Sequence, residues 1–281
     1  MQMKTNQRRM LPASIALNVF CVVISLICIV PVLWMYVSSI RGNASFMLNP
    51  IAFPKEFVIQ NYVAASRISS IFMAMGNSTL YVIFSLVLVN IGAFITSYFF
   101  SRYEFKGKNF IFSVYLAGML IPLYALMVPV FVQYKILGLL NNRLALVITY
   151  FAMQMPLAIF LYRSFIDGVP RELDDAATID GCSIVQRLSR IIFPLCRPII
   201  GTISILTAIS VWNEFAFSVI LTPKTNLRTV AVAVRFFSSD IKVDYTLQFA
   251  GLCMVTLPIL LLYIAFSKEI MKGMISGAVK G

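Results

Sequence analysis

Six apolar runs, each long enough to cross a lipid bilayer as a helix, dominate this chain. The runs cover residues 15–37, 71–100, 110–131, 144–161, 199–221 and 247–266. The hydrocarbon core of a bilayer is about 30 Å thick, and an α-helix needs about 20 residues to cross it. Because 60% of the residues are hydrophobic and only 12% are charged, water is not the main solvent of this chain. The sequence therefore predicts an all-α membrane protein with six transmembrane helices.

The basic residues indicate how these helices are oriented. If the N-terminus is cytoplasmic, the cytoplasmic loops and termini carry more Lys and Arg than the outer loops, as the positive-inside rule requires. We expect a multi-pass protein of the cell membrane with both termini in the cytoplasm. The net charge of +12 is scattered over the loops and not gathered into a stripe, so these charges are expected to set the topology, and no nucleic-acid partner is expected. The apolar spans themselves would contact membrane lipid.

The residue types needed for most catalytic and metal sites are missing. The sequence contains no histidine, and its five cysteines show no C-x-x-C spacing, so we expect neither a metal site nor catalytic residues. No G-x-x-x-x-G-K-[ST] pattern is present, so this chain lacks the loop that binds ATP phosphates. We therefore expect no cofactor in this chain and no enzymatic activity.

A polar segment between the fourth and fifth runs, residues 163–198, has the signals of ordered structure. Pro170 suits the first position of a helix, and Gly181 suits its C-terminal end. Three acidic residues fall in the first turn, where backbone N–H groups favour negative charge: Glu172, Asp174 and Asp175.

A second short helix should follow the glycine. Ser183 and Gln186 have the S-x-x-Q spacing of a capping box. Pro194 and Pro198 should end that helix before the next span. The sequence thus predicts a helix, a glycine corner and a second helix on the cytoplasmic side.

Such a segment has two interpretations. In the first, it is an amphipathic bracket that lies on lipid head groups. Alternatively it contacts a protein, because its carboxylates would be repelled by an anionic leaflet. These carboxylates belong to Glu172, Asp174, Asp175 and Asp180.

Residues 171–181, with the pairs Ala176-Ala177 and Asp180-Gly181, resemble the EAA loop of ABC importer permeases. Phe193-Pro194 and Pro198 follow at the spacing of that family, and Asp175 stands where the family usually has Glu. The resemblance implies that this loop couples the chain to an ATPase. The implied coupling residues are Glu172, Asp174, Asp175, Ala176, Ala177, Asp180 and Gly181.

Further motifs extend the resemblance over nearly the whole chain. They are Phe53-Pro54, Asn61-Tyr62, Asn77-Ser78, residues 102–107, residues 138–141, Trp212-Asn213-Glu214-Phe215 and the tail 277–281. Together they are similar to the permease subunits of carbohydrate importers of the maltose type, and among these to the G subunit. The implied fold is the six-helix, MetI-like fold of type I ABC importers.

The same resemblance implies a domain division and a set of partners. Residues 1–70 would form the N-terminal tail, first helix and outer loop, residues 71–267 the ABC transmembrane core, and residues 268–281 a cytoplasmic tail. The partners would be a second permease in a heterodimer, a cytoplasmic ATPase dimer that binds ATP and Mg²⁺, and an extracytoplasmic solute-binding protein. The cargo would be a sugar or oligosaccharide, which the sequence does not name.

One acidic residue, Glu214, falls inside a predicted span. A carboxylate facing lipid is costly, so it should face a cavity or a partner group. With Trp212 and Asn213 beside it, it is a candidate for the translocation path, because sugars bind to hydrogen-bonding groups and aromatic faces. The alternative is a structural hydrogen bond across helices.

Two other function classes fit less well. A secondary transporter usually shows paired repeats and several ionisable groups inside the membrane, and here Glu214 stands alone. A membrane-embedded enzyme needs a cluster of His, Cys or carboxylates, which the sequence lacks. Dependence of uptake on ATP and on a binding protein would separate an ABC importer from a secondary transporter.

Overall fold

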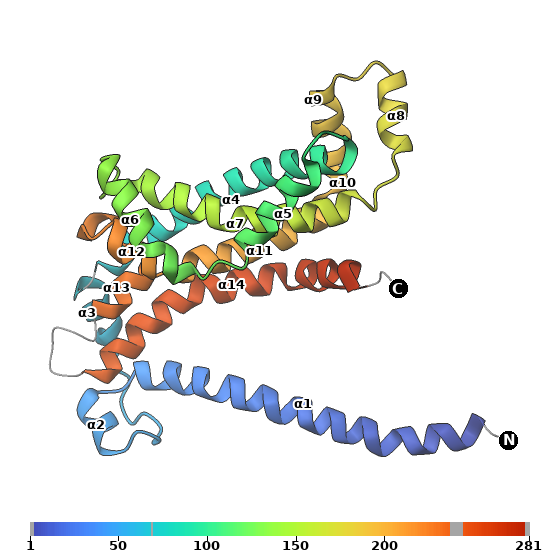
Figure 1. The fold of residues 1–281 in the computed structure, drawn as a ribbon. Coiled ribbons are helices and arrows are strands. Elements are labelled where there is room, and N and C mark those ends of the chain that lie inside the picture. The colour runs from blue at the N-terminus through green and yellow to red at the C-terminus, as the bar shows by residue number, and fades with distance from the viewer. Residues whose placement is uncertain (1–2, 69, 237–243, 279–281) are drawn as a thin grey trace. The chain divides into compact units, whose positions relative to one another are not determined.

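The computed structural model describes residues 3–68, 70–236 and 244–278, and within these ranges the chain forms helices and no strand (Figure 1). The prediction of an all-α protein is confirmed. Part of the connection between the predicted spans 199–221 and 247–266, residues 237–243, lies outside the described residues. The chain divides into two compact units, Met1–Ser69 with Phe237–Met254 and Ser70–Phe236 with Val255–Gly281.

The first unit contains α1 (Met3–Ser39), α2 (Asn43–Leu48), α3 (Gln60–Ile68) and the start of α14 (Tyr245–Ala278). Its polar centre is Arg41, which is 1% exposed. The Arg41 guanidinium donates hydrogen bonds to the carbonyl oxygens of Ser45, Asn49 and Pro50. Trp34 of α1 donates to the same Pro50 oxygen at 3.0 Å. The segment after α1 is therefore folded back onto the end of α1.

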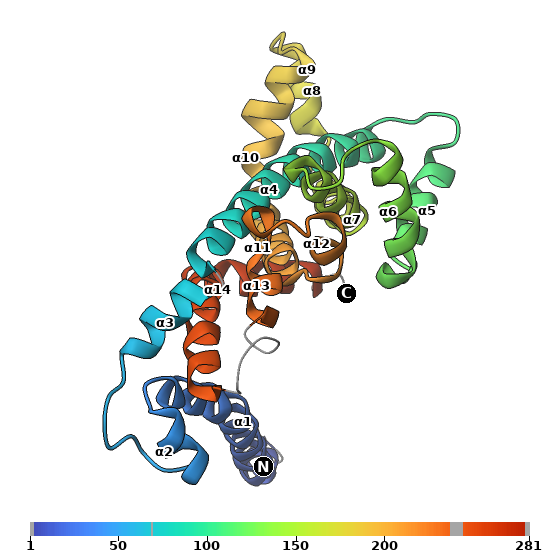
Figure 2. The same cartoon turned by 90° about the vertical axis from the view of Figure 1, so that its left-hand side faces the viewer.

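The second unit holds the remaining helices. In chain order they are α4 (Ile71–Arg102), α5 (Lys108–Gly118), η1 (Leu123–Leu126), α6 (Met127–Ile136), α7 (Arg143–Ile166), α8 (Glu172–Ile179), α9 (Ile184–Gln186), the π-helix η2 (Arg187–Ile192), α10 (Phe193–Leu195), α11 (Arg197–Asn213), α12 (Ala216–Leu221), η3 (Thr225–Leu227) and α13 (Val230–Phe236), followed by the later part of α14. Helix α4 packs along α7 and α11 (Figure 2). These three helices form the centre of the unit.

Among the residues that the structure describes, four helices are long and apolar enough to cross a membrane: Ile15–Ser39, Ile71–Arg102, Arg143–Ile166 and Tyr245–Ile264. Two bent pairs, Lys108–Gly118 with Leu123–Ile136 and Ile184–Leu195 with Arg197–Asn213, bring the number to six if each pair counts as one span. The fold class agrees with the prediction. The third and fifth spans, however, are not straight helices.

The third predicted span, residues 110–131, is interrupted in its middle. Helix α5 ends at Gly118, the helical path resumes at Leu123, and its direction bends by 98° between the two parts. Pro122 stands at this break. Proline lacks an N–H group and disfavours helical geometry in the residue before it, so an apolar run that contains it need not form one helix.

Two proline assignments in the polar segment were wrong. Helix α8 begins at Glu172, so Pro170 lies before the helix and not at its first position. Pro194 does not end the second helix, because it lies in the first turn of α10 directly after the π-helical turn. That helical segment ends at Leu195, and the path then turns by 77° into α11, where Pro198 lies in the first turn.

Polar side chains fix the three central helices in register. Asn90 of α4 donates to Ser204 of α11 at 3.1 Å and accepts from Tyr162 of α7 at 2.7 Å. Ser97 of α4 donates to the Ile159 carbonyl of α7 at 2.9 Å. Inside a membrane such bonds, together with close packing, hold helices together. The central helices therefore form a firm base for the segments at their ends.

Candidate coupling segment and translocation path

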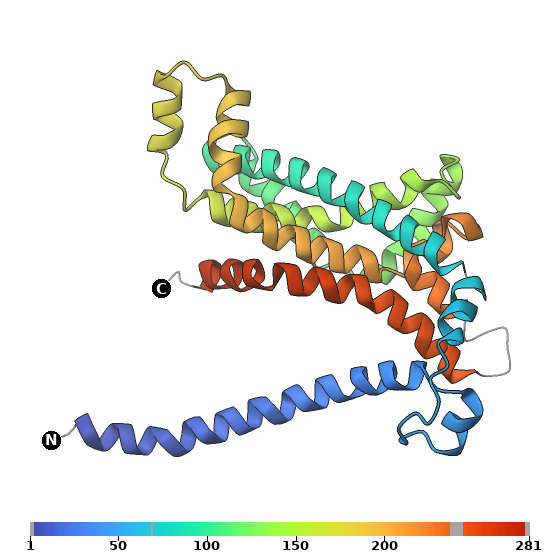
Figure 3. The same cartoon turned by 180° about the vertical axis from the view of Figure 1, so that it is seen from behind.

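Helices α8 and α9 extend beyond the ends of α4, α7 and α11 (Figures 1 and 3). The corner after α8 is a Schellman motif, in which the N–H of Cys182 bonds to the Ala177 carbonyl and the N–H of Gly181 bonds to the Thr178 carbonyl. Gly181 has φ of +75°, in the left-handed region that glycine adopts at little cost. The predicted glycine corner is confirmed.

The predicted capping box is also present. The Ser183 hydroxyl accepts from the N–H of Gln186, and the Gln186 side chain accepts from the N–H of Ser183. The bonds satisfy two N–H groups at the start of α9 that have no partner within the helix. The corner and the cap together fix the direction in which the chain leaves α8.

The predicted coupling residues divide into two groups by exposure. Glu172, Asp175, Ala176, Asp180 and Gly181 are exposed. Asp174 and Ala177 are buried within the chain, at 7% and 3% exposure. The exposed face also carries a large apolar side chain, Ile179, at 86% exposure. A face that mixes carboxylates with an exposed isoleucine suits a protein partner better than an anionic lipid surface.

Asp174 makes its bonds inside this chain. Its Oδ1 accepts from the Tyr98 hydroxyl at 2.7 Å, and its Oδ2 lies 2.8 Å from Nε of Arg102. Both partners come from the end of α4. This carboxylate therefore joins α8 to α4.

Glu214 is also bonded within the chain. Helix α11 ends at Asn213, Glu214 is extended with ψ of 122°, and α12 begins at Ala216. The Glu214 carboxylate accepts from the N–H groups of Phe217 and Ser218 at 2.7 and 3.1 Å, and from the Tyr150 hydroxyl of α7 at 2.9 Å. The fifth predicted span is thus broken where a carboxylate caps the N–H groups of α12. Of the two interpretations of Glu214, the geometry supports the structural bond across helices.

The neighbours of Glu214 differ from each other. Trp212 is 7% exposed and packs in the core formed by α4, α7, α11 and α12. Asn213 is exposed, and its side chain donates to the Ile209 carbonyl of its own helix at 2.9 Å. Of the three candidates for the translocation path, only Asn213 is exposed on the surface of this chain.

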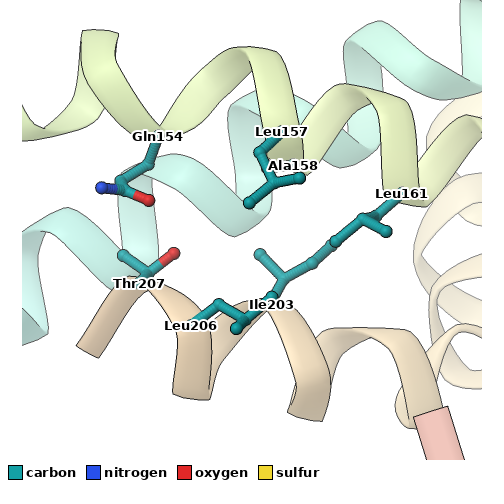
Figure 4. Close-up of a pocket in the computed structure, with 7 residues that line it drawn as sticks. All are labelled: Gln154, Leu157, Ala158, Leu161, Ile203, Leu206 and Thr207. Atoms are coloured by element: carbon teal, nitrogen blue, oxygen red, sulfur yellow. The ribbon is translucent and has the colours of Figure 1, made fainter. Parts of the chain in front are cut away.

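The crevice between α7 and α11 is too small for a sugar. Gln154, Leu157, Ala158, Leu161, Ile203, Leu206 and Thr207 line it (Figure 4), and its volume is about 10 Å³. That is about the space of one water molecule. A wider cavity of about 520 Å³ lies beneath the bend after α5, and Gln133, Tyr134 and Thr149 are polar residues of its wall.

A metal site is not formed by the part of the chain that the structure describes, where no three His, Cys, Asp or Glu side chains gather to hold an ion. The buried Asp174 carboxylate joins α8 to α4 instead. Outside the spans, the hydrogen bond from Lys108 holds the pKa of the exposed Glu104 carboxyl below its usual value.

The partners of the two buried carboxylates were not predicted from the sequence. Arg102 and Tyr98 bind Asp174, and Tyr150 binds Glu214. Arg102 was noted only as the first residue of the motif 102–107, although a basic residue at the end of a span can pair with an acidic residue of a neighbouring loop. No pattern marked either tyrosine, since each lies in an apolar run far from its partner in sequence.

Comparison with known proteins agrees with this architecture. The chain is 34% identical to the probable ABC transporter permease protein YurM of Bacillus subtilis, over 89% of this chain and 83% of that protein. It is 31% identical to the diacetylchitobiose uptake system permease protein NgcG of Streptomyces coelicolor, over 88% of this chain and 82% of that protein. A solved bacterial ABC transporter that takes part in alginate import has a chain of the same fold, with a TM-score of 0.81 and 22% identity over 91% of this chain and 95% of that one.

A family model places the chain more firmly. The model of the binding-protein-dependent transport system inner membrane component matches residues 91–267, which is most of the second unit and more than half of the sequence. Members of this family are transport subunits and not enzymes, in agreement with the prediction from the missing catalytic motifs. The chain belongs to the family of inner membrane components of binding-protein-dependent transport systems.

Proposed function

We propose that this chain is one permease of a heterodimer that imports a sugar or oligosaccharide, driven by a cytoplasmic ATPase dimer that docks on α8. The single observation that carries the coupling role is the exposed face of α8. This short helix extends beyond the central helices and bears Glu172, Asp175 and Ile179 exposed next to a rigid glycine corner (Figure 1).

Membership in the family supports the proposed partners. A binding-protein-dependent system delivers its solute from a separate binding protein, and ATP must be bound by another subunit, because this chain has no phosphate-binding loop. The ATP and Mg²⁺ of transport would belong to that ATPase.

The saccharide cargo rests on two supports. The motifs resemble those of carbohydrate importers of the maltose type, and the relative NgcG is described as a permease for diacetylchitobiose uptake. Of the residues proposed for the translocation path, we now assign Asn213 to face the cargo or the second permease. Glu214 and Trp212 hold the broken helix in place.

The test is uptake by a reconstituted complex. The chain should be copurified with its second permease and ATPase and placed in liposomes with the binding protein outside. We expect labelled oligosaccharide to accumulate only when ATP is supplied on the ATPase side and the binding protein is present. Accumulation driven by an ion gradient without ATP would contradict the proposal.

The proposed orientation, with both termini cytoplasmic, makes a prediction for two exposed sites at opposite ends of the second unit. Leu137 follows α6 and is 66% exposed, whereas Phe105 follows the end of α4 that bonds to α8 and is 42% exposed. In a version without the native cysteines, a cysteine at Leu137 should react with an impermeant maleimide in intact cells, and one at Phe105 should react only after permeabilisation. The reverse labelling pattern would show that the orientation is inverted.

A further inference from the structure

We propose that Asp174, Arg102 and Tyr98 act as positioning residues that fasten α8 to the end of α4, so that the two helices move as one lever. This proposal rests on the proposed docking of the ATPase on α8. It assigns Asp174, unlike its exposed neighbours, to transmission within this chain and not to contact with the partner.

The buried geometry at Asp174 is the first support. The side chains of Arg102 and Asp174 are 7% and 10% exposed, and each carboxylate oxygen of Asp174 has a donor from α4 within 2.8 Å. Arg102 is also held from its other side, because its Nη2 donates to the Val169 carbonyl at 2.8 Å. Arg102 at the end of α4 therefore bonds both to α8 and to the segment that precedes α8.

The second support comes from Arg187 of the π-helix η2. Its Nη1 donates to the Thr178 hydroxyl of α8 at 2.8 Å, and its Nη2 donates to the Tyr103 hydroxyl after α4 at 3.1 Å. Its Nε lies 3.5 Å from Oδ1 of Asp174. The Asp174 carboxylate of α8 thus lies between two guanidinium groups, that of Arg102 from α4 and that of Arg187 from η2. These side chains join the three segments.

Electrostatics explains why this junction should resist opening. Pulling α8 away from α4 would break the two hydrogen bonds that the Asp174 carboxylate accepts from Tyr98 and Arg102, and hydrogen bonds to a charged group are stronger than those between neutral groups. Force applied to α8 is therefore passed to α4. Because α4 packs along α7 and α11, a displacement of α4 reaches the centre of the membrane unit.

The neighbouring residue offers a matched control. Asp175 lies on the same helix and in the same first turn, but it is exposed, whereas Asp174 is buried. Asp174→Asn and Asp175→Asn remove the same charge from adjacent positions. Only the first change touches the junction.

The experiment measures the distance between spin labels at Ile91 and Ile179, which are both exposed on the parent chain. It uses the permease pair before the ATPase is added, because Ile179 lies on the face that the ATPase would cover, and uptake is measured separately on the unlabelled complex. We expect one narrow distance distribution in the parent and in Asp175→Asn, and a broadened one in Asp174→Asn. Uptake per ATP hydrolysed should fall about tenfold or more in Asp174→Asn, because the buried guanidinium loses its counter-charge, while the ATPase stays bound.

If Asp174→Asn does not assemble, Tyr98→Phe tests the same junction by deleting one hydrogen bond, and Arg102→Lys should restore part of the coupling that Arg102→Met loses. A distance distribution in Asp174→Asn or Tyr98→Phe that matches the parent overturns the lever, whatever happens to uptake. Failure of the docking proposal is recognised separately, because then substitutions on the exposed face of α8 leave ATPase retention unchanged.

Discussion

Replacing Gly181 with arginine is expected to abolish ATP-driven uptake while the permease pair still inserts and assembles. Gly181 has φ of +75° at an exposed corner, and a Cβ there would meet nothing within 4 Å. The substitution should therefore cost only about 1 kcal/mol of local stability within this chain. The loss of uptake would come from the contact with the ATPase, because a long cationic side chain at Gly181 would occupy the surface on which the ATPase binds α8. Retention of the ATPase on the purified permease pair, measured beside uptake, checks this.

Gly138→Arg is the matched control. Gly138 also has a positive φ, of +67°, and an added Cβ would also meet nothing within 4 Å. It follows α6, and α6 and α8 lie at opposite ends of the unit (Figure 1). The backbone cost of the two substitutions should be nearly equal, so Gly138→Arg should keep its ATPase. Full retention and full uptake in Gly181→Arg would remove the coupling role from this corner.

Glu214→Ala is expected to lower both transport and the stability of the complex. The substitution leaves three buried donors without an acceptor, the N–H groups of Phe217 and Ser218 and the Tyr150 hydroxyl. Each buried donor left unpaired costs about 1 to 3 kcal/mol, so we expect a total loss of about 3 kcal/mol or more. The melting temperature of the purified complex should fall, and uptake should fall with it because α12 loses its cap.

Two milder variants separate the parts of this site. Glu214→Gln keeps one acceptor oxygen and should lose about half as much stability, whereas Tyr150→Phe removes a single hydrogen bond and should cost about 1 kcal/mol. If Glu214→Ala melts and transports like the parent chain, the carboxylate makes no necessary bond. A loss of transport in Glu214→Ala at unchanged melting temperature would instead place the carboxylate in the path of the cargo.

Local signals in the sequence predicted the corner and its cap. The positive φ of Gly181 and the hydrogen bonds between Ser183 and Gln186 depend only on residues close in sequence, and the structure shows both as predicted. The length of the apolar runs likewise predicted the spans, since the thickness of the bilayer sets that length. Features of this kind depend on neighbours in sequence or on the solvent.

The breaks in the third and fifth spans were harder to predict. Pro122 indicates the first break, but the residues around it are so apolar that one continuous span was predicted. At the second break no glycine or proline is present. There the helix ends because the Glu214 carboxylate binds the N–H groups of α12 and a tyrosine from another helix. Asp174 was hard to predict for the same reason. Its acidic neighbours in sequence indicate a surface residue, whereas its bonding partners, Arg102 and Tyr98, come from α4.

A photo-cross-linking amino acid at Ile179, introduced into the complex in native membranes, tests the central claim most directly. Ile179 is 86% exposed at the end of α8. We predict a covalent adduct with a subunit whose peptides contain the G-x-x-x-x-G-K-[ST] loop of an ATPase, and no such adduct from the same amino acid at Leu137. Adducts at Ile179 with lipid alone, while ATP-driven uptake continues, would contradict the claim that α8 is the seat of the ATPase.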